Sequence, residues 1–307
     1  MKITTTVIGS YPYARMEPED AIGRAVEEQI TAGIDVISDG QVRADMVAIF
    51  AKGIPGYQLQ GRKANVISKI IPPTKAISLG DLSIATDIAS GRAKVKGIIT
   101  GPTTMAHCSI LNEVCPYKPH ETREGSQSMT VDPELVLDIA RAMAREAEFL
   151  TEAGYNVIQI DEPFFSLPDV DVDIGLEAIG MVADKIDFSA IHVCGDIRPI
   201  MTKLLDSKVN LVEVEGGYLV QLDWLTPALL EEKNKKICWS VISVDTNDVE
   251  SVEEISQRIN ACVDRLGTEN IWVSPDCGMR ARKPESAKGK LNNMVKAVRK
   301  IETTFNQ

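Results

Sequence analysis

His192 and Cys194, a histidine and a cysteine two positions apart, have the types and spacing to bind a metal ion. They end a β-branched run, and residues two apart on a strand share one face, so both side chains could reach one ion. Glu215 ends a second such run, and Cys277 follows a Pro-Asp turn after a third. One imidazole nitrogen, two thiolates and one carboxylate oxygen form a tetrahedral donor set that suits zinc. We therefore predict a zinc site here, against the simpler interpretation that the histidine and the cysteines pack in the core.

Other groups of reactive residues support weaker alternatives. Asp161 and Glu162 could suggest acid–base hydrolysis, but adjacent residues on a strand point to opposite faces, so they cannot both line one site. Zinc hydrolases usually have three protein ligands and a water molecule, whereas the set above has four protein ligands. A second metal cluster stays open, although no two-residue spacing supports it, and it would use His107, Cys108, Cys115 and His120.

These side chains must be positioned by elements that bring the ends of several strands together. Short β-branched runs alternate with helical patterns almost throughout the chain, which is typical of βαβ units and a parallel sheet. The predicted strands are 5–9, 34–38, 95–100, 157–161, 190–194, 211–215, 237–243 and 271–274. Eight such units fit a (β/α)₈ TIM barrel, in which the chemistry lies at the carboxyl ends of the strands.

The helices and one long connection complete this prediction. Helices are expected at 18–32, 81–91, 133–153, 175–187, 197–207, 222–233, 250–266 and 284–302. The stretch 40–94 is too long for one crossover and contains glycine- and proline-marked turns, so we expect an inserted excursion with a hairpin between strands two and three, over one barrel mouth. No internal repeat or low-complexity linker interrupts the pattern, which favours one domain over residues 1–307.

The charge balance excludes several classes of partner. Lysine and arginine number 33 against 44 acidic residues, a formal net charge of −11. Nucleic acids and anionic membrane surfaces attract basic proteins, so neither is an expected partner. No signal peptide or membrane span is recognisable, and six cysteines in a chain of 307 residues are read as thiols or metal ligands of a cytoplasmic protein.

The motifs TTTVIGSYP, GIDVISDG, VIQIDEP, HVCGD, VEVEGG and VSPDCGMRAR, in this order, resemble the C-terminal catalytic barrel of cobalamin-independent methionine synthase, in its short core form. The resemblance implies a methyltransferase that forms methionine from homocysteine. It also implies that the homocysteine sulfur binds a zinc ion held by His192, Cys194, Glu215 and Cys277. The amino-acid end of the substrate would be bound by Ile8, Gly9, Ser10 and Asp161.

The sequence also departs from this family at four functional positions. Cys108 stands where a tryptophan stacks on folate, and Leu167 where a glutamate contacts it. Gln41 replaces a substrate-binding glutamate, and Asp245 aligns with the proton-donating histidine and is our candidate catalytic residue. Short relatives of this kind are thought to take the methyl group from methylcobalamin or a methylated corrinoid protein. We therefore expect one of these donors rather than methylfolate.

The chemistry of the predicted zinc site follows from its charges. A free thiol with a pKa of about 8.5 is only a few per cent ionised at pH 7, and coordination to zinc displaces its proton. Around Zn²⁺, a neutral His192, two thiolates and one carboxylate give the site a net charge of −1. An electron-rich zinc ion of this kind withdraws less charge from a bound sulfur, so the sulfur stays reactive. We expect Glu215, the hard oxygen ligand, to loosen when substrate sulfur binds. Two alternatives remain: an alkyltransferase that acts on another thiol such as coenzyme M, and a non-catalytic corrinoid- or zinc-binding accessory protein.

Overall fold

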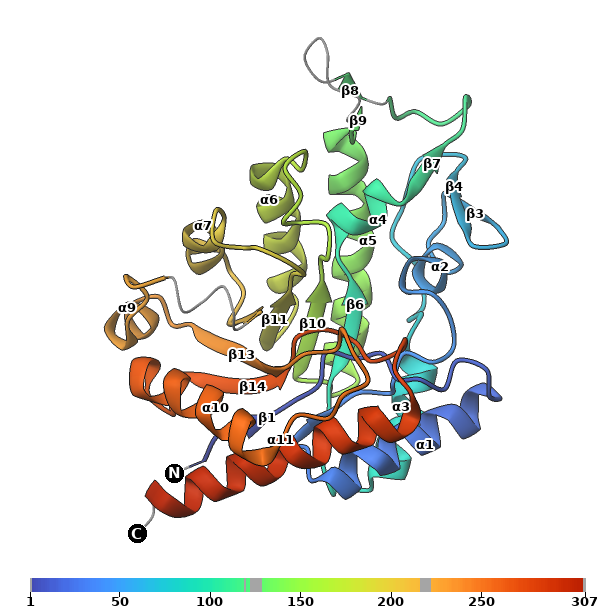
Figure 1. Ribbon diagram of the computed structural model, residues 1–307. Coiled ribbons are helices and arrows are strands. Elements are labelled where there is room, and N and C mark those ends of the chain that lie inside the picture. The colour runs from blue at the N-terminus through green and yellow to red at the C-terminus, as the bar shows by residue number, and fades with distance from the viewer. Residues whose placement is uncertain (1, 119, 122–128, 216–221, 306–307) are drawn as a thin grey trace. The chain divides into compact units, whose positions relative to one another are not determined.

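The computed structural model describes residues 2–118, 120–121, 129–215 and 222–305 (Figure 1). The chain divides into two compact units, and neither is a continuous stretch of sequence. Unit 1 consists of Met1–Arg43, Gly80–Lys96 and Asn210–Gln307, and unit 2 of Ala44–Leu79 and Gly97–Val209. Each unit contains parallel strands with helices against them, so the α/β class that the sequence predicts is correct.

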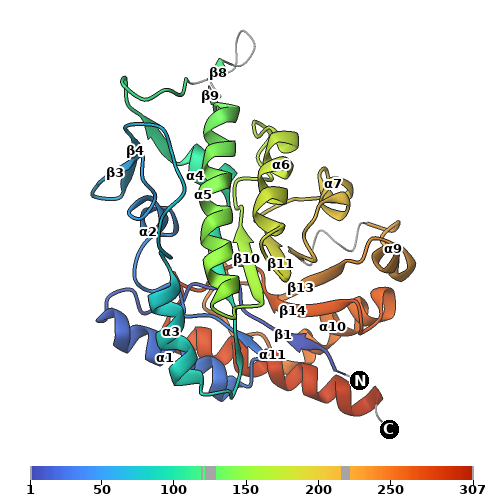
Figure 2. The ribbon, with the colours of Figure 1, turned by 180° about the vertical axis from the view of Figure 1, so that it is seen from behind.

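Unit 1 contains parallel strands from both ends of the chain. Its strands run in the order β1 (Thr4–Thr5), β14 (Ile271–Pro275), β13 (Lys236–Ile242) and β12 (Leu211–Val214). A bridge between Thr6 and Val36 joins β1 to β2 (Val36–Ile37), which pairs in parallel with β5 (Lys94–Val95). The helices of this unit are α1 (Pro18–Ala32), α3 (Leu79–Ala89), α9 (Pro227–Glu232), α10 (Val252–Leu266) and α11 (Pro284–Phe305). Helix α11 lies against both α1 and α10 (Figure 2).

Unit 2 contains a second set of parallel strands, in the order β11 (Phe188–His192), β10 (Val157–Asp161) and β6 (Gly97–Thr100). Strands β3 (Tyr57–Gln60) and β4 (Lys63–Val66) form an antiparallel hairpin, and β7 (Ser109–Leu111) pairs with β4 in parallel. A further antiparallel pair joins β8 (His120–Glu121) and β9 (Met129–Thr130). Its helices are α2 (Met46–Ala51), α4 (Pro102–His107), α5 (Pro133–Glu152), α6 (Val172–Ala183) and α7 (Met201–Asp206).

Helix α5 shows how the sequence specifies the core of unit 2. Asp132 caps its first turn by accepting the N–H of Glu134 at 2.9 Å, and Pro133 occupies the first helical position, where its missing N–H costs nothing. Apolar residues at helical spacing, among them Leu135, Ile139 and Leu150, are fully buried. Each buried leucine or isoleucine contributes about 1.5–3 kcal/mol relative to an exposed one, which fixes α5 against α6 and β6.

The predicted elements are present, with differences at their ends. Helix α1 has the predicted bounds, and the hairpin expected within 40–94 is β3–β4. The strand predicted over 95–100 is two strands, β5 and β6, that Lys96 separates. The predicted helix at 197–207 is shortened to α7, and two helices of six residues, α2 and α4, escaped the sequence patterns. Among the described residues, no helix combines the length and the apolar character needed to span a membrane.

Candidate metal centre

Strand β11 of unit 2 carries the predicted histidine–cysteine pair. His192 is its last residue and is 4% exposed, and Cys194 follows two positions later. The Nε2 atom of His192 and the Sγ atom of Cys194 are 3.4 Å apart. An imidazole nitrogen and a thiol therefore lie side by side, although the strand ends at His192 and not at residue 194 as predicted.

The backbone of this pair is held by the segment that follows β10. The N–H of Glu162 donates to the carbonyl of His192 at 2.8 Å, and the Ser166 hydroxyl donates to the carbonyl of Cys194 at 2.6 Å. Gly195 comes next with φ of 79°, a left-handed conformation that glycine adopts without strain. The carbonyls of both candidate ligands in unit 2 are thus bound by residues of one short stretch of chain.

Asp161 and Glu162 occupy different surroundings at the end of β10. The amide of Gln159, two positions earlier on the strand, donates to Asp161 at 2.5 Å. The carboxylate of Glu162 is fully buried and accepts the N–H groups of Thr103 and Thr104 and the Thr104 hydroxyl, at 2.7–2.9 Å. Burial raises the pKa of Glu162 to about 7, although these hydrogen bonds oppose the rise.

Unit 1 brings together the ends of β1, β2 and β14, where the predicted substrate-binding residues 8–10 and 41 lie. The Ser38 hydroxyl donates to the carbonyl of Gly9 at 2.9 Å, and the N–H of Met279 donates to the carbonyl of Ser10 at 2.7 Å. The Arg280 guanidinium donates to the carbonyl of Gln41, whose φ of 45° is unusual for a residue with a side chain. Ile8, which precedes these contacts, is 4% exposed.

The remaining candidate ligands, Glu215 and Cys277, are neighbours of Asp276 in unit 1. Partial burial, together with the nearby charges of Glu215, Cys277 and Asp245, raises the pKa of Asp276 to about 6, although a hydrogen bond from the N–H of Val244 opposes the rise. Several acidic groups thus lie within electrostatic reach of one another. Such a group fits a cation, because a divalent ion would relieve the repulsion among anionic donors.

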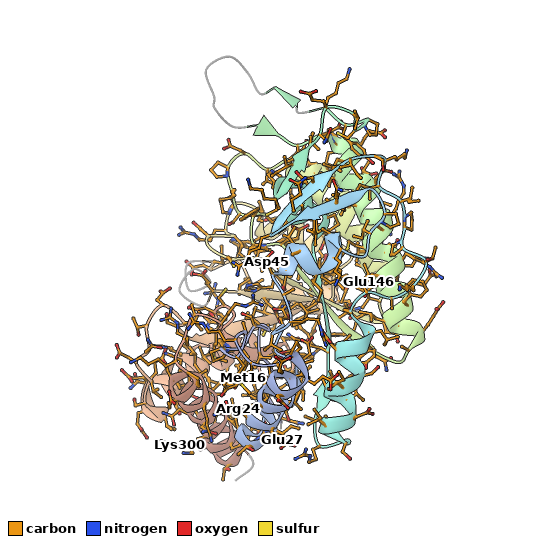
Figure 3. The ribbon with its side chains drawn as sticks, turned by 90° about the vertical axis from the view of Figure 1, so that its right-hand side faces the viewer. Met16, Arg24, Glu27, Asp45, Glu146 and Lys300 are labelled. Atoms are coloured by element: carbon orange, nitrogen blue, oxygen red, sulfur yellow. The ribbon has the colours of Figure 1, made fainter. Side chains whose placement is uncertain are left out.

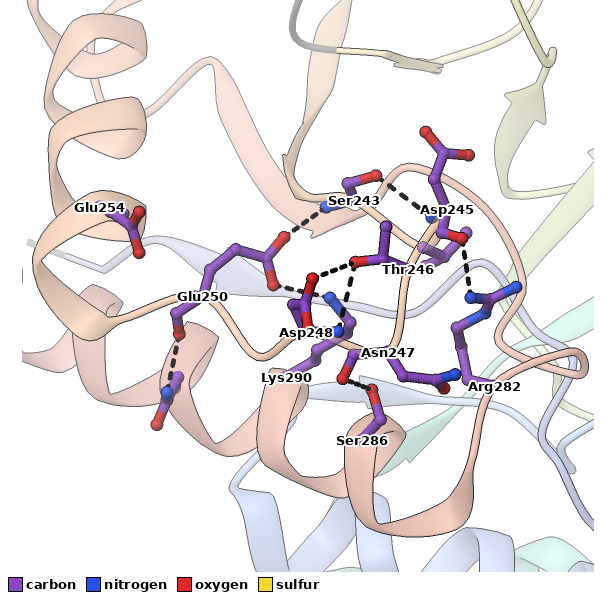
Figure 4. A network of polar contacts seen from close by, with 12 residues as sticks. Ser243, Asp245, Thr246, Asn247, Asp248, Glu250, Glu254, Arg282, Ser286 and Lys290 are labelled. Carbon is purple, nitrogen blue, oxygen red and sulfur yellow. Dashed lines mark hydrogen bonds and ion pairs between the residues drawn. The ribbon is translucent and has the colours of Figure 1, made fainter.

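Asp245 belongs to an exposed turn that α11 holds in place. The N–H of Asp245 donates to the Ser243 hydroxyl oxygen at 3.2 Å, and its carbonyl accepts a hydrogen bond from Arg282 at 2.8 Å. In Figure 4 its carboxylate points away from these contacts. The contacts described here involve the backbone of Asp245 and not its carboxylate. A catalytic role for Asp245 stays a prediction.

The alternative metal cluster receives little support from unit 2. The Nδ1 atom of His107 lies 2.8 Å from the carbonyl of Thr103, and the thiol of Cys115 donates to the carbonyl of Tyr117 at 3.5 Å. Burial, together with the charges of Asp45 and Glu162, raises the pKa of Cys108, which disfavours the thiolate form that metals bind. The side chain of His120 lies outside the described residues.

The sequence reasoning missed a buried ion pair in unit 1. Lys96 and Glu213 have side chains that are each 1% exposed, and the Lys96 Nζ atom lies 3.5 Å from a Glu213 oxygen and 2.5 Å from the carbonyl of Val7. A lysine inside the apolar run VKGIIT, and a glutamate two positions before Glu215, were the available signals. The ammonium group of Lys96 therefore compensates the buried negative charge of Glu213 near the end of β12.

Comparison with known proteins places the chain in a family. Residues 13–300 match the family described as "Cobalamin-independent synthase, Catalytic domain". A methionine synthase of Methanothermobacter marburgensis is 37% identical over 95% of this chain and 98% of its own length, and one of Methanocaldococcus jannaschii is 34% identical over 97% and 99%. A B12-independent methionine synthase from a Shewanella species, solved with selenomethionine, has the same fold, with a TM-score of 0.80, 19% identity and 99% of both chains covered.

The family also bears on the expected methyl donor. Its description is cobalamin-independent, and the matching solved structure is called B12-independent. The expectation that methylcobalamin or a methylated corrinoid protein donates the methyl group is therefore not supported.

The family assignment rests on a match over most of the chain and on relatives with more than 30% identity. The chain belongs to the family of cobalamin-independent synthase catalytic domains.

Proposed function

We propose that the chain is a methionine synthase that transfers a methyl group to the thiol of homocysteine with the help of zinc. The observation that carries the proposal is the adjacent His192 and Cys194, 3.4 Å apart, in a chain whose full-length relatives are named methionine synthases. The proposed fold is a single (β/α)₈ TIM barrel over residues 1–307, with an inserted excursion between its second and third strands. The parallel order of the strands within each unit supports it.

The proposed metal ligands are His192, Cys194, Glu215 and Cys277. Imidazole and thiolate donors suit zinc, and the group of acidic side chains around Asp276 would be relieved by a cation. When bound, zinc would supply the positive charge that makes a substrate thiol lose its proton near pH 7.

The residues of the chain itself would bind and orient the amino-acid part of homocysteine. Asp161 offers a carboxylate to the α-ammonium group, while the N–H groups near Gly9 and the Ser10 hydroxyl offer donors to the α-carboxylate. Gln41 would border this part of the site, where its unusual φ of 45° fixes the backbone. Asp245, exposed on its turn, would accept or relay a proton.

The proposal can be tested with purified, zinc-loaded protein, which is incubated with each of several methyl donors in combination with each of several thiols. We expect methionine, identified by mass spectrometry, from homocysteine with one of methyltetrahydrofolate, methylcobalamin or a methylated corrinoid protein, and about one zinc ion per chain. Product from coenzyme M but not from homocysteine would replace the proposed acceptor. Absence of methyl transfer in every combination would favour a non-catalytic binding protein.

A further inference from the structure

The stretch of residues 162–166 connects three elements of unit 2. Its first residue, Glu162, follows the end of β10, and its carboxylate binds the start of α4. Its backbone N–H and the hydroxyl of its last residue, Ser166, bind the carbonyls of His192 and Cys194. One short segment therefore links β10, α4 and the residues at the end of β11.

The carboxylate of Glu162 is the anchor of this segment. It is fully buried, and one oxygen accepts the N–H of Thr103 at 2.9 Å while the other accepts the N–H and the hydroxyl of Thr104, both at 2.7 Å. Gly101 leaves the room for this contact, because a Cβ atom there would overlap the carboxylate carbon of Glu162. The carboxyl group of Glu162 is thus fixed by three hydrogen bonds in a space that a side chain at position 101 would fill.

The anchored segment in turn restrains the direction of the candidate ligands. A carbonyl held by a hydrogen bond limits the rotation of its peptide plane, and the peptide plane directs the neighbouring side chains. His192 and Cys194 each have their carbonyl held in this way, and Asp161 is bonded directly to Glu162 in the chain. Metal affinity and substrate alignment both depend on such outer contacts, because small displacements of a ligand are costly.

We infer that Glu162 is a positioning residue that, through residues 162–166, orients His192 and Cys194 for metal binding and Asp161 for the substrate. The inference rests on the proposed function, since it concerns the same site. Glu162 touches neither metal nor substrate in this account, and it acts through hydrogen bonds to the backbone.

Unit 2 provides a matched control in Glu146, on α5 (Figure 3). Like Glu162, it is fully buried, and its carboxylate accepts two backbone N–H groups, of Ile77 at 2.8 Å and Ser78 at 2.9 Å, together with the Ser78 hydroxyl at 2.7 Å. The two sites have the same kinds of donor and are equally buried. Only Glu162 also donates its backbone N–H to the carbonyl of a candidate metal ligand, His192. A comparison of the two glutamates therefore distinguishes an effect on ligand position from an effect on stability.

The test compares Glu162→Gln with Glu146→Gln in the full chain. A glutamine turns its amide NH₂ toward one of the donors in either place, so both variants should lose thermal stability to a similar degree. We expect Glu162→Gln to weaken zinc binding, measured by competition with a chelator, about 10- to 100-fold, and to raise KM for homocysteine. Glu146→Gln should change both quantities less than about twofold, since it touches no part of the site.

Milder variants keep the test valid where Glu162→Gln does not fold. Thr104→Val removes one hydrogen bond from the Glu162 carboxylate, and Thr104→Ser retains it, so serine should restore the zinc affinity that valine loses. Ser166→Ala should weaken zinc binding without disturbing that carboxylate, because it removes the hydrogen bond to the carbonyl of Cys194. Ser78→Ala, which removes the hydroxyl that donates to Glu146, should leave zinc binding unchanged.

Two outcomes would overturn the inference, and both differ from a failure of the proposed function. Equal zinc affinity and KM in Glu162→Gln and Glu146→Gln would show that Glu162 contributes only stability. Unchanged zinc affinity in both Thr104→Val and Ser166→Ala would have the same meaning. A wild-type protein that neither binds zinc nor transfers a methyl group would instead contradict the proposed function.

Discussion

Asp39 shows how a single side chain at a strand end acquires an unusual protonation behaviour. It lies half-buried after β2, and its Oδ1 atom accepts the N–H of Gln41 at 3.0 Å. Burial raises the pKa of Asp39 from 3.8 to about 6, and the neighbouring carboxylate of Asp81 adds to the rise, while Arg43 opposes it. The folded protein therefore keeps this proton at a pH where the unfolded chain has lost it.

The sign of this shift predicts a pH dependence of stability. Because the folded pKa is the higher one, ionisation of Asp39 lowers the free energy of unfolding as pH rises from about 4 to about 6, and the loss stays constant above that range. Asp39→Asn keeps the acceptor for Gln41 and removes the charge. Urea unfolding at about pH 4.5 and about pH 7 should show the variant gaining about 1 kcal/mol over wild type at the higher pH, a value reduced for solvent screening. An identical difference at both values of pH would contradict the assigned shift.

The proposed ligands predict a second result at the same scale. Cys194→Ser and Cys277→Ser should each lose most of the bound zinc and the activity, because a hydroxyl is a poor ligand for this metal. Circular dichroism should show an unchanged fold, since a chain of this size does not depend on one ion to fold. Cys108→Ser is the matched control and should retain its zinc. Full zinc content in both ligand variants, measured by atomic absorption, would show that the ligands are wrongly assigned.

Residue patterns predicted part of the candidate site and missed the rest for a physical reason. His192 and Cys194 are close in the sequence, so a local pattern could predict their contact, although the strand itself ends at His192. The role of Glu162 depends on the start of α4, 58 residues or more away in the sequence, and the partner of Lys96, Glu213, is still more remote. Local periodicity contains no information on such distant hydrogen-bond partners.

At the scale of elements, the turn after β13 and helix α11 are held together by a half-buried carboxylate. Glu250 accepts hydrogen bonds from Lys290 and from the N–H of Ser243, both at 2.8 Å (Figure 4). Burial favours the neutral form of Glu250, but these hydrogen bonds outweigh it and hold its pKa below the usual value. The charged pair therefore fixes the turn that contains Asp245 onto α11.

Removal of the lysine should loosen this turn. Lys290 is 1% exposed and lies 2.8 Å from Glu250, so Lys290→Met leaves Glu250 with only the more exposed Arg258, 3.7 Å away, and should lower the free energy of unfolding by about 2 kcal/mol near pH 7. The effect should shrink toward about pH 4, where Glu250 is protonated in the variant and its charge no longer needs a partner. Lys288→Met changes an exposed lysine of the same helix and should have little effect in the same urea titration. Equal losses in both variants would contradict the role of the pair.

The elements that could be predicted are those with strong signals at both ends. Helix α1 has Pro18 at its start and Gly33, with φ of 85°, after its end, so its bounds follow from the sequence. Helices α2 and α4 contain six residues each, too few for a periodic pattern to develop. The short strand β7 pairs with β4, which lies more than 40 residues earlier, and nothing local indicates that partner.

At the scale of the whole molecule, the proposed zinc ion would bind the folded chain and not the unfolded one. Its binding energy would therefore add to the free energy of unfolding. Removal of zinc by a chelator should therefore lower the melting temperature by about 5 °C in calorimetry. Cys277→Ser should show no such shift, and an equal shift in that variant would show that the chelator acts elsewhere.

The interleaving of the two units also fixes an order of events on the ribosome. Translation proceeds from the N-terminus, and unit 2 ends at Val209, so all of its residues exist while Asn210–Gln307 of unit 1 is still to be made. Strand β1 meanwhile lacks β14, its neighbour through the pairing of Thr4 with Trp272, and α1 lacks α11. Unit 2 can therefore complete its core during synthesis, whereas the early strands and helices of unit 1 must wait. The buried face of α1 thus stays uncovered by α11 until the last part of the chain has been made.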